Sequence, residues 1–216
     1  MEQRMRLNVG CGRTCPQEWG NLDATLQVIV QQWPALERLR AIAHRTGLIH
    51  ESQARAYPDN IIYWNVSKGL PFPTGSVDVV YSCHFLEHLP YEVGQTYLSD
   101  AFRVLRPGGI LRTVVPNLTG RLHKHFINRN NVELVPEKVH PDNVDYIPEN
   151  LGNIVSRTMG HGMHLWGYAW ETLSYEYKKH GFPEPRRGEF RKSEIRDVEE
   201  VETHDGLIVE AHKPKA

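Results

Sequence analysis

An apolar run that ends in a Gly-x-Gly turn constrains the fold of this chain more than any other feature. The run is Leu7-Asn8-Val9-Gly10-Cys11-Gly12, and a second short run, Asn21-Leu22-Asp23, ends in a carboxylate. A strand followed by glycines lets the backbone approach a ligand, and an acid at the tip of the next strand can accept hydrogen bonds from ribose hydroxyls. Together the two runs predict a nucleotide-type site in an open α/β sheet.

The spacing of these residues limits the class of ligand that the site can bind. The third glycine of the dinucleotide fingerprint is absent, because Cys15 stands where it would fall. Asp23 also follows Gly10 more closely than the roughly 20 residues expected at NAD sites. A mononucleoside-like cofactor without a pyrophosphate is therefore favoured, and S-adenosylmethionine is our candidate.

Strand and helix patterns alternate along most of the chain. We expect strands at 6–10, 20–24, 61–66, 77–82 and 110–115, and helices within 26–45 (broken at Pro34), from Pro90 to Arg106 and at 169–180. Two last segments, 188–193 and 207–212, could pair as an antiparallel edge. This order predicts an α/β fold with a doubly wound, mostly parallel, Rossmann-like sheet that binds ligands at the carboxyl ends of its strands.

Apolar periodicity supports two of the helices. After Pro90, apolar residues recur every four positions, at Val93, Tyr97, Ala101 and Leu105. Within 26–45, helical spacing is followed by Leu36, Leu39 and Ala43. Such stripes are typical of helices that face a core.

Residues 117–165 show no clear period and are rich in Asn, His and Pro. A segment of this length without its own pattern is usually a functional loop, so we expect an inserted lid that covers the acceptor site. The whole chain of 216 residues is long enough for one sizeable domain. We therefore expect a single domain spanning 1–216.

Composition excludes several classes of protein. The net charge of −1 gives no global field that would draw the chain to nucleic acid or to anionic membranes, and we expect neither as a partner. No run of 18 apolar residues is present, and the charged start lacks the apolar region of a secretory signal. The three cysteines, Cys11, Cys15 and Cys83, suit a reducing compartment, so we expect a cytoplasmic location.

The chain resembles the class I S-adenosylmethionine-dependent methyltransferases, and more narrowly the small type 11 methyltransferases. The matching stretches are residues 7–12, 19–23, 69–73, 78–81, 86–89 and 103–109, followed by His164, Tyr168, Glu171, Gly181 and Phe182. Two positions depart from the family pattern. Asn65 stands where an acid is common, and Ala169 stands where Asp would cap the last helix, a loss of about 0.5–2 kcal/mol.

The resemblance implies roles for the residues at the strand ends. Gly10, Cys11 and Gly12 would pass under the methionine part of the cofactor, and Asp23 would hold the ribose diol. Adenine would be flanked by Asn65 and Val66, and the methionine side would be lined by Ser82 and Cys83. Plainer roles stay open: a simple glycine turn, a surface cap at Asp23, an ordinary strand-end Asn65, and a small buried hydrophobe at Cys83.

Methyl transfer to a hydroxyl would profit from a base whose pKa is near neutrality, and histidine is the natural choice. The candidates are His84, His88, His161 and His164. Each could equally be a structural or solvated histidine. We expect O-methylation of a small-molecule or sugar-like acceptor.

Two other classes compete with this hypothesis. His84-x-x-Glu87-His88 spells the inverted zinc-peptidase signature, but that chemistry needs a long helix and a third ligand, whereas Pro90 follows at once. A protein that binds S-adenosylmethionine without transferring its methyl group also stays open. Nucleic-acid methylation is disfavoured, because the chain has neither an Asn-Pro-Pro-Tyr motif nor a long basic stripe.

Overall fold

The computed structural model of the chain describes residues 5–31, 33–47, 55–117, 165 and 167–215. His161, His164 and nearly all of the expected lid at 117–165 lie outside these residues. Of the four candidate histidines, His84 and His88 lie within them.

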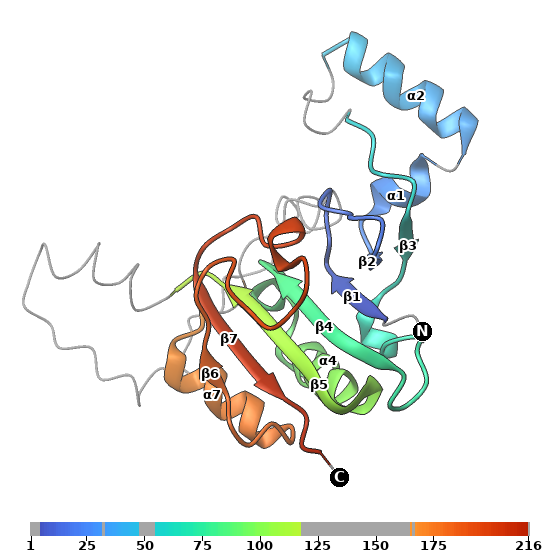
Figure 1. Cartoon of the computed structure of the whole chain (residues 1–216). Helices are drawn as coiled ribbons and strands as arrows, with labels where there is room; N and C mark the ends of the chain where they lie inside the picture. The colour runs from blue at the N-terminus through green and yellow to red at the C-terminus, as the bar shows by residue number, and fades with distance from the viewer. Residues whose placement is uncertain (1–4, 32, 48–54, 118–164, 166, 216) are drawn as a thin grey trace, which may run out of the picture.

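One mixed sheet forms the centre of the described structure (Figure 1). Its strands are β1 (Arg6–Val9), β2 (Gly20–Asp23), β3 (Ile61–Tyr63), β4 (Val77–Cys83), β5 (Leu105–Val115), β6 (Arg186–Arg187) and β7 (Leu207–His212), in the spatial order β3-β2-β1-β4-β5-β7-β6. The first five strands run parallel to one another, whereas β7 is antiparallel to both β5 and β6. The predicted fold class, mostly parallel with an antiparallel C-terminal edge, is confirmed.

Four α-helices connect the described strands: α1 (Leu26–Val30), α2 (Pro34–Arg45), α4 (Tyr91–Val104) and α7 (Trp170–Lys179). Short 3-10 turns occupy Val66–Lys68, Leu86–His88 and Val198–Glu200. The break expected at Pro34 is confirmed, because this proline starts α2, where a missing N–H costs no hydrogen bond. None of the described helices is long and apolar enough to cross a membrane.

Three sequence-based boundaries are wrong. The helix after Pro90 ends at Val104 rather than Arg106, because Leu105 already pairs with Val77 and the Gly108 amide donates to the Lys213 carbonyl. The stretch Pro107-Gly108-Gly109 therefore lies inside β5 instead of stopping a helix.

The other two errors concern strand length. Strand β3 ends at Tyr63 and not at Val66, because the Asn65 side chain caps a 3-10 turn by accepting from the Ser67 amide at 3.0 Å. The edge partner of β7 is Arg186–Arg187 instead of 188–193. The Gly188 amide still donates to the Ile208 carbonyl of β7, and residues 189–193 then leave the strand, where the Ser193 hydroxyl donates to Glu210.

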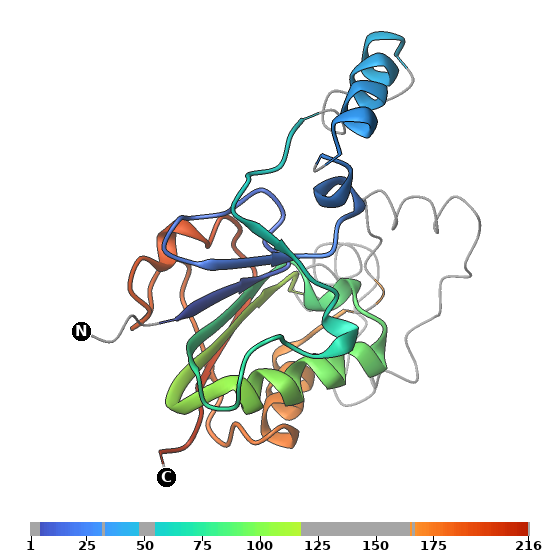
Figure 2. The same ribbon diagram turned by 90° about the vertical axis from the view of Figure 1, so that its right-hand side faces the viewer.

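The two faces of the sheet are covered differently. Helices α4 and α7 lie on one face (Figure 2), and their buried Tyr97, Leu98, Leu173 and Tyr177 form the larger core cluster with β4 and β5. The second face carries a separate cluster, in which Tyr81 and Val114 from the sheet meet Trp19, Ile195 and Val198. This cover comes from the β1–β2 connection and from the chain around the last 3-10 turn.

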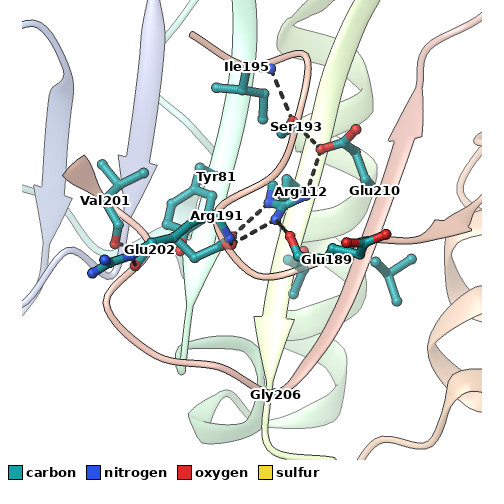
Figure 3. A network of polar contacts seen from close by, with 12 residues as sticks. Tyr81, Arg112, Glu189, Arg191, Ser193, Ile195, Val201, Glu202, Gly206 and Glu210 are labelled. Carbon is teal, nitrogen blue, oxygen red and sulfur yellow. Dashed lines mark hydrogen bonds and ion pairs between the residues drawn. The ribbon is translucent and has the colours of Figure 1, made fainter. Parts of the chain in front are cut away.

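A buried arginine of β5 holds the segment 189–202 against the second face of the sheet (Figure 3). Arg112 on β5 is fully buried, and its guanidinium donates two hydrogen bonds of 2.7 Å to the Glu202 carboxylate. It also donates to Glu210 and to the Glu189 carbonyl, each at 2.9 Å. Since a buried charge is costly unless it is paired and hydrogen-bonded, this network holds residues 189–202 against β5.

Candidate functional site

The glycine turn lies at the carboxyl end of β1 and folds back onto β2. The amides of Gly10 and Cys11 both donate to the Leu22 carbonyl, at 2.8 and 3.1 Å. Gly10 and Gly12 have φ values of +68° and +54°, the left-handed region that glycine adopts most readily. The turn therefore presents main chain, with few side-chain atoms, at this edge of the sheet.

Asp23 joins that turn to the end of β2. Its Oδ2 accepts from the Gly12 amide at 2.9 Å, and its Oδ1 accepts from the Thr25 amide at 2.7 Å. An ionised carboxylate can accept about four hydrogen bonds, so each oxygen keeps capacity for a further donor. The capping role and a ligand-binding role for Asp23 are thus compatible.

Phe85 packs directly over the glycine turn, which sequence reasoning missed. A Cβ added to Gly10 would lie 2.1 Å from Phe85 Cδ2, so a larger residue at position 10 would have to displace the Phe85 side chain. The Phe85 ring packs edge-on against Tyr97, with ring centroids 5.5 Å apart. The one sequence signal for this contact is the position of Phe85, just after β4 and before the 3-10 turn Leu86–His88.

Two cysteines of the turn lie side by side. The Sγ atoms of Cys11 and Cys15 are 3.6 Å apart, and Cys11 is buried against Val28 and Ile61. The hydrogen bond between the thiols raises the pKa of Cys11 and lowers the pKa of Cys15. Because the Cys11 thiol faces a small core, only the main chain of Cys11 can line a ligand site.

The residues expected around adenine lie just beyond β3. Asn65 is exposed, and its side-chain oxygen is engaged by the Ser67 amide. Val66 is buried in the larger core cluster. In the structure Asn65 therefore acts as the cap of this turn.

The end of β4 sends its two predicted residues to opposite faces. Ser82 is fully buried, with Oγ 3.5 Å from Thr113 Oγ1 on β5. Cys83 packs on the second face of the sheet, and burial raises the pKa of its thiol to about 11. The Ser82 side chain therefore belongs to the core, and only its main chain reaches the strand end.

His84, Glu87 and His88 gather just beyond β4. Glu87 is 1% exposed, and its Oε1 lies 3.6 Å from His84 Nδ1 and 4.0 Å from His88 Nε2. His84 has a φ of +50°, a conformation that is costly for a non-glycine residue and often marks functional sites. The Leu165 amide donates to the Glu87 carbonyl at 2.7 Å, which ties the end of the expected lid to this cluster.

This geometry does not suit the zinc alternative. The inverted zinc-peptidase motif needs both histidines on one face of a helix, but His84 is left-handed and precedes a single 3-10 turn. In the described part of the chain, no group of three His, Cys, Asp or Glu side chains could hold a metal ion. No observation therefore favours metal-assisted hydrolysis.

Comparison with known families points to one class of enzyme. The model of a family described as a methyltransferase domain matches residues 7–113. A curated relative, a probable S-adenosylmethionine-dependent methyltransferase from Mycolicibacterium smegmatis, is 48% identical over 48 residues. That alignment spans 22% of this chain and 18% of the relative's length.

Solved structures of methyltransferases are also similar. A possible histamine N-methyltransferase from Thermotoga maritima gives a TM-score of 0.48 at 15% identity, with 98% of this chain and 82% of that chain covered. An S-adenosylmethionine-dependent methyltransferase from Methanosarcina mazei gives 0.48 at 16% identity, with 100% and 95% covered.

Proposed function

Because this chain belongs to the class I S-adenosylmethionine-dependent methyltransferases, we propose that it transfers a methyl group to an oxygen of a small or sugar-like acceptor. The observation that carries the proposal is the corner formed by the glycine turn and Asp23. There the Gly12 amide and the Asp23 carboxylate are 2.9 Å apart, at the carboxyl edge where such sheets bind ligands.

The residues of this corner fit the cofactor. Asp23 keeps acceptor capacity for two ribose hydroxyls. Phe85 covers Gly10, but a Cβ added to Gly12 would meet no heavy atom within 4 Å, which leaves room there for the methionine part. We assign the adenine side to Asn65 and Val66, and the remaining wall to Cys83 and to the main chain of Ser82. When bound, S-adenosylmethionine supplies an electrophilic methyl group on its sulfonium, so the protein's own task is orientation.

We propose that His84 is the general base that accepts the proton from the hydroxyl group of the acceptor. Its imidazole lies just beyond β4, is about one quarter exposed, and has the buried Glu87 carboxylate 3.6 Å from Nδ1. A carboxylate beside one ring nitrogen can orient an imidazole, which suits a general base. His88, His161 and His164 stay as the other predicted candidates.

Calorimetric titration with S-adenosylmethionine tests the cofactor site. We expect one-site binding by the wild type and binding at least tenfold weaker for Asp23→Asn, because the ribose loses a charged acceptor. Asp78→Asn is the matched control. Asp78 is a carboxylate near the amino end of β4, away from the site at the carboxyl ends of the strands, and it pairs with Arg106. Equal affinity of the wild type and Asp23→Asn would refute the assignment.

Transfer of a labelled methyl group to a panel of sugars and other small hydroxyl compounds tests the reaction. We expect a product with the wild type and a loss of at least a hundredfold with His84→Gln, at unchanged cofactor affinity. Binding without transfer to any acceptor would support the non-catalytic alternative.

A single domain over 1–216 and a cytoplasmic location remain part of the proposal. The three free thiols suit a reducing compartment. Limited proteolysis and cell fractionation are the corresponding tests.

A further inference from the structure

Large apolar side chains are exposed together on helix α2 and on the residue before it. Trp33, Leu36, Leu39 and Ile42 are 61%, 41%, 60% and 56% exposed. The helix stands away from the sheet in both views (Figures 1 and 2). Because apolar surface gains free energy when it leaves water, such a group of side chains marks a surface for a partner.

These side chains share one face of α2. At about 100° per residue, five apolar residues fall within a sector of about 120° and Ala41 lies outside it; the five are Ala35, Leu36, Leu39, Ile42 and Ala43. The opposite side carries Glu37 and His44, and Glu37 forms an ion pair with Arg40. The helix is thus amphipathic, with its apolar side turned to solvent.

Arginines border this apolar face on both sides. Arg38 and Arg45 lie four residues before and three residues after Ile42, so both are its neighbours on the helix surface. Arg40, four residues after Leu36, lies at the other border, but its side chain is only 12% exposed and is paired with Glu37. Residues 33–47 contain three arginines and one glutamate, a net charge of 3 − 1 = +2 with histidine neutral, in a chain whose net charge is −1.

We propose that α2 docks on a bilayer surface that carries anionic lipids. Leu36, Leu39 and Ile42 enter the boundary of the acyl chains, and the exposed Arg38 and Arg45 lie at the level of the phosphates. Trp33, at the start of the helix, is the residue type that favours this interface. This proposal departs from the expectation that anionic membranes are not a partner, which rested on the net charge of the whole chain. That charge does not oppose docking by one basic helix, because screening restricts the relevant field to about 10 Å.

A second copy of the chain fits this face less well. In a two-fold helix seam, the residues that border one apolar face meet those that border the other. Here the borders carry arginines, and the acid of α2, Glu37, already pairs with Arg40. Like charges would therefore face one another across the seam, whereas anionic phosphates would neutralise them.

Vesicle co-sedimentation of the full chain tests the proposal. We expect pelleting with phosphatidylcholine vesicles that contain phosphatidylglycerol, and much less with phosphatidylcholine alone. The variant L36S/L39S/I42S should bind at least tenfold more weakly, and R38Q/R45Q on the order of tenfold or more. Tyr175→Ser is the control, since Tyr175 on α7 is equally exposed but lies outside α2.

Three results would overturn the proposal. The first is that the wild type fails to pellet with anionic vesicles, and the second is that the triple serine variant pellets like the wild type. The third is that light scattering shows a dimer of the wild type that is absent for the triple serine variant. Calorimetry with S-adenosylmethionine accompanies each variant, and we expect unchanged affinity because α2 contributes no residue to the glycine turn. If the triple variant loses cofactor binding as well, the single variant Leu39→Ser decides by the same pelleting criteria.

Discussion

Helices α4 and α2 were expected from the same kind of apolar periodicity, yet they meet different surroundings. Tyr97, Leu98 and Ala101 on α4 are at most 1% exposed, whereas Leu39 and Ile42 on α2 are more than half exposed. Periodicity thus predicts a helix and its apolar face. It does not predict what that face contacts.

The position of each helix relative to the sheet explains the difference in exposure of their apolar faces. Helix α4 joins β4 to β5 in the middle of the sheet, so its apolar face lies against several strands. Helix α2 precedes β3, the edge strand, which has three residues and exposes Ile62 and Tyr63. Because the sheet of the described residues ends at β3, it has no further strand against which the apolar face of α2 could pack.

Ion pairs should show the largest contrast between the sheet body and α2. Glu202→Ala removes the bidentate partner of the buried Arg112, and we expect a loss of about 3–5 kcal/mol in the free energy of unfolding. Glu37→Ala, which removes the more exposed pair with Arg40, should cost below about 1 kcal/mol. Urea denaturation of both variants measures the difference, and equal losses would contradict the contrast.

Apolar truncation should follow the same order. Leu98→Ala leaves a cavity under α4 and should cost about 2–5 kcal/mol. Leu39→Ala on α2 should stay within about 0.5 kcal/mol, because its side chain is already in water. Urea denaturation again measures both changes. A loss for Leu39→Ala as large as that for Leu98→Ala would show that the α2 face is covered in the folded monomer.

Glycines with positive φ offer a matched pair. Gly10→Ala meets both a left-handed backbone and the Phe85 ring, so we expect a loss of about 2–4 kcal/mol and weaker cofactor binding. Gly47, just after α2, has φ +74°, but a Cβ added there would meet no heavy atom within 4 Å. Gly47→Ala should therefore cost only about 1 kcal/mol, with cofactor affinity unchanged. Thermal unfolding and calorimetry compare the two variants, and equal effects on both would contradict the contact with Phe85.

The smallest effect concerns pH. Burial between α4 and α7 lowers the pKa of His180, whose Nδ1 lies 2.8 Å from the Ser99 hydroxyl. The unfolded chain then binds more protons than the folded one, so stability should fall as the pH drops below about 6.5. His180→Asn should reduce this slope, while His44→Asn on α2 serves as the control. An unchanged slope in His180→Asn would contradict the prediction.

The positions of the glycine turn and of Asp23 at strand ends, and the mostly parallel sheet, were predicted because they depend on local rules. Glycines at a strand end and a carboxylate at the next are visible in the sequence, and alternating elements restrict the topology. The cover of the second face was not predicted, since it depends on Arg112 pairing with Glu202, 90 residues away.

Side-chain direction at the site was also beyond sequence reasoning. Ser82 and Cys83 are adjacent, but alternation along β4 sends one into the core with Thr113 and the other to the opposite face. Asn65 caps a turn because β3 ends earlier than its apolar run. Such outcomes depend on register and strand length, which composition does not determine.

A crystal structure with S-adenosylhomocysteine, the product form of the cofactor, tests the central claim most directly. We predict both ribose hydroxyls within hydrogen-bond distance of the Asp23 carboxylate, with the methionine part over the Gly10–Gly12 main chain. A ligand bound elsewhere, or ribose hydroxyls that do not contact Asp23, would contradict the account.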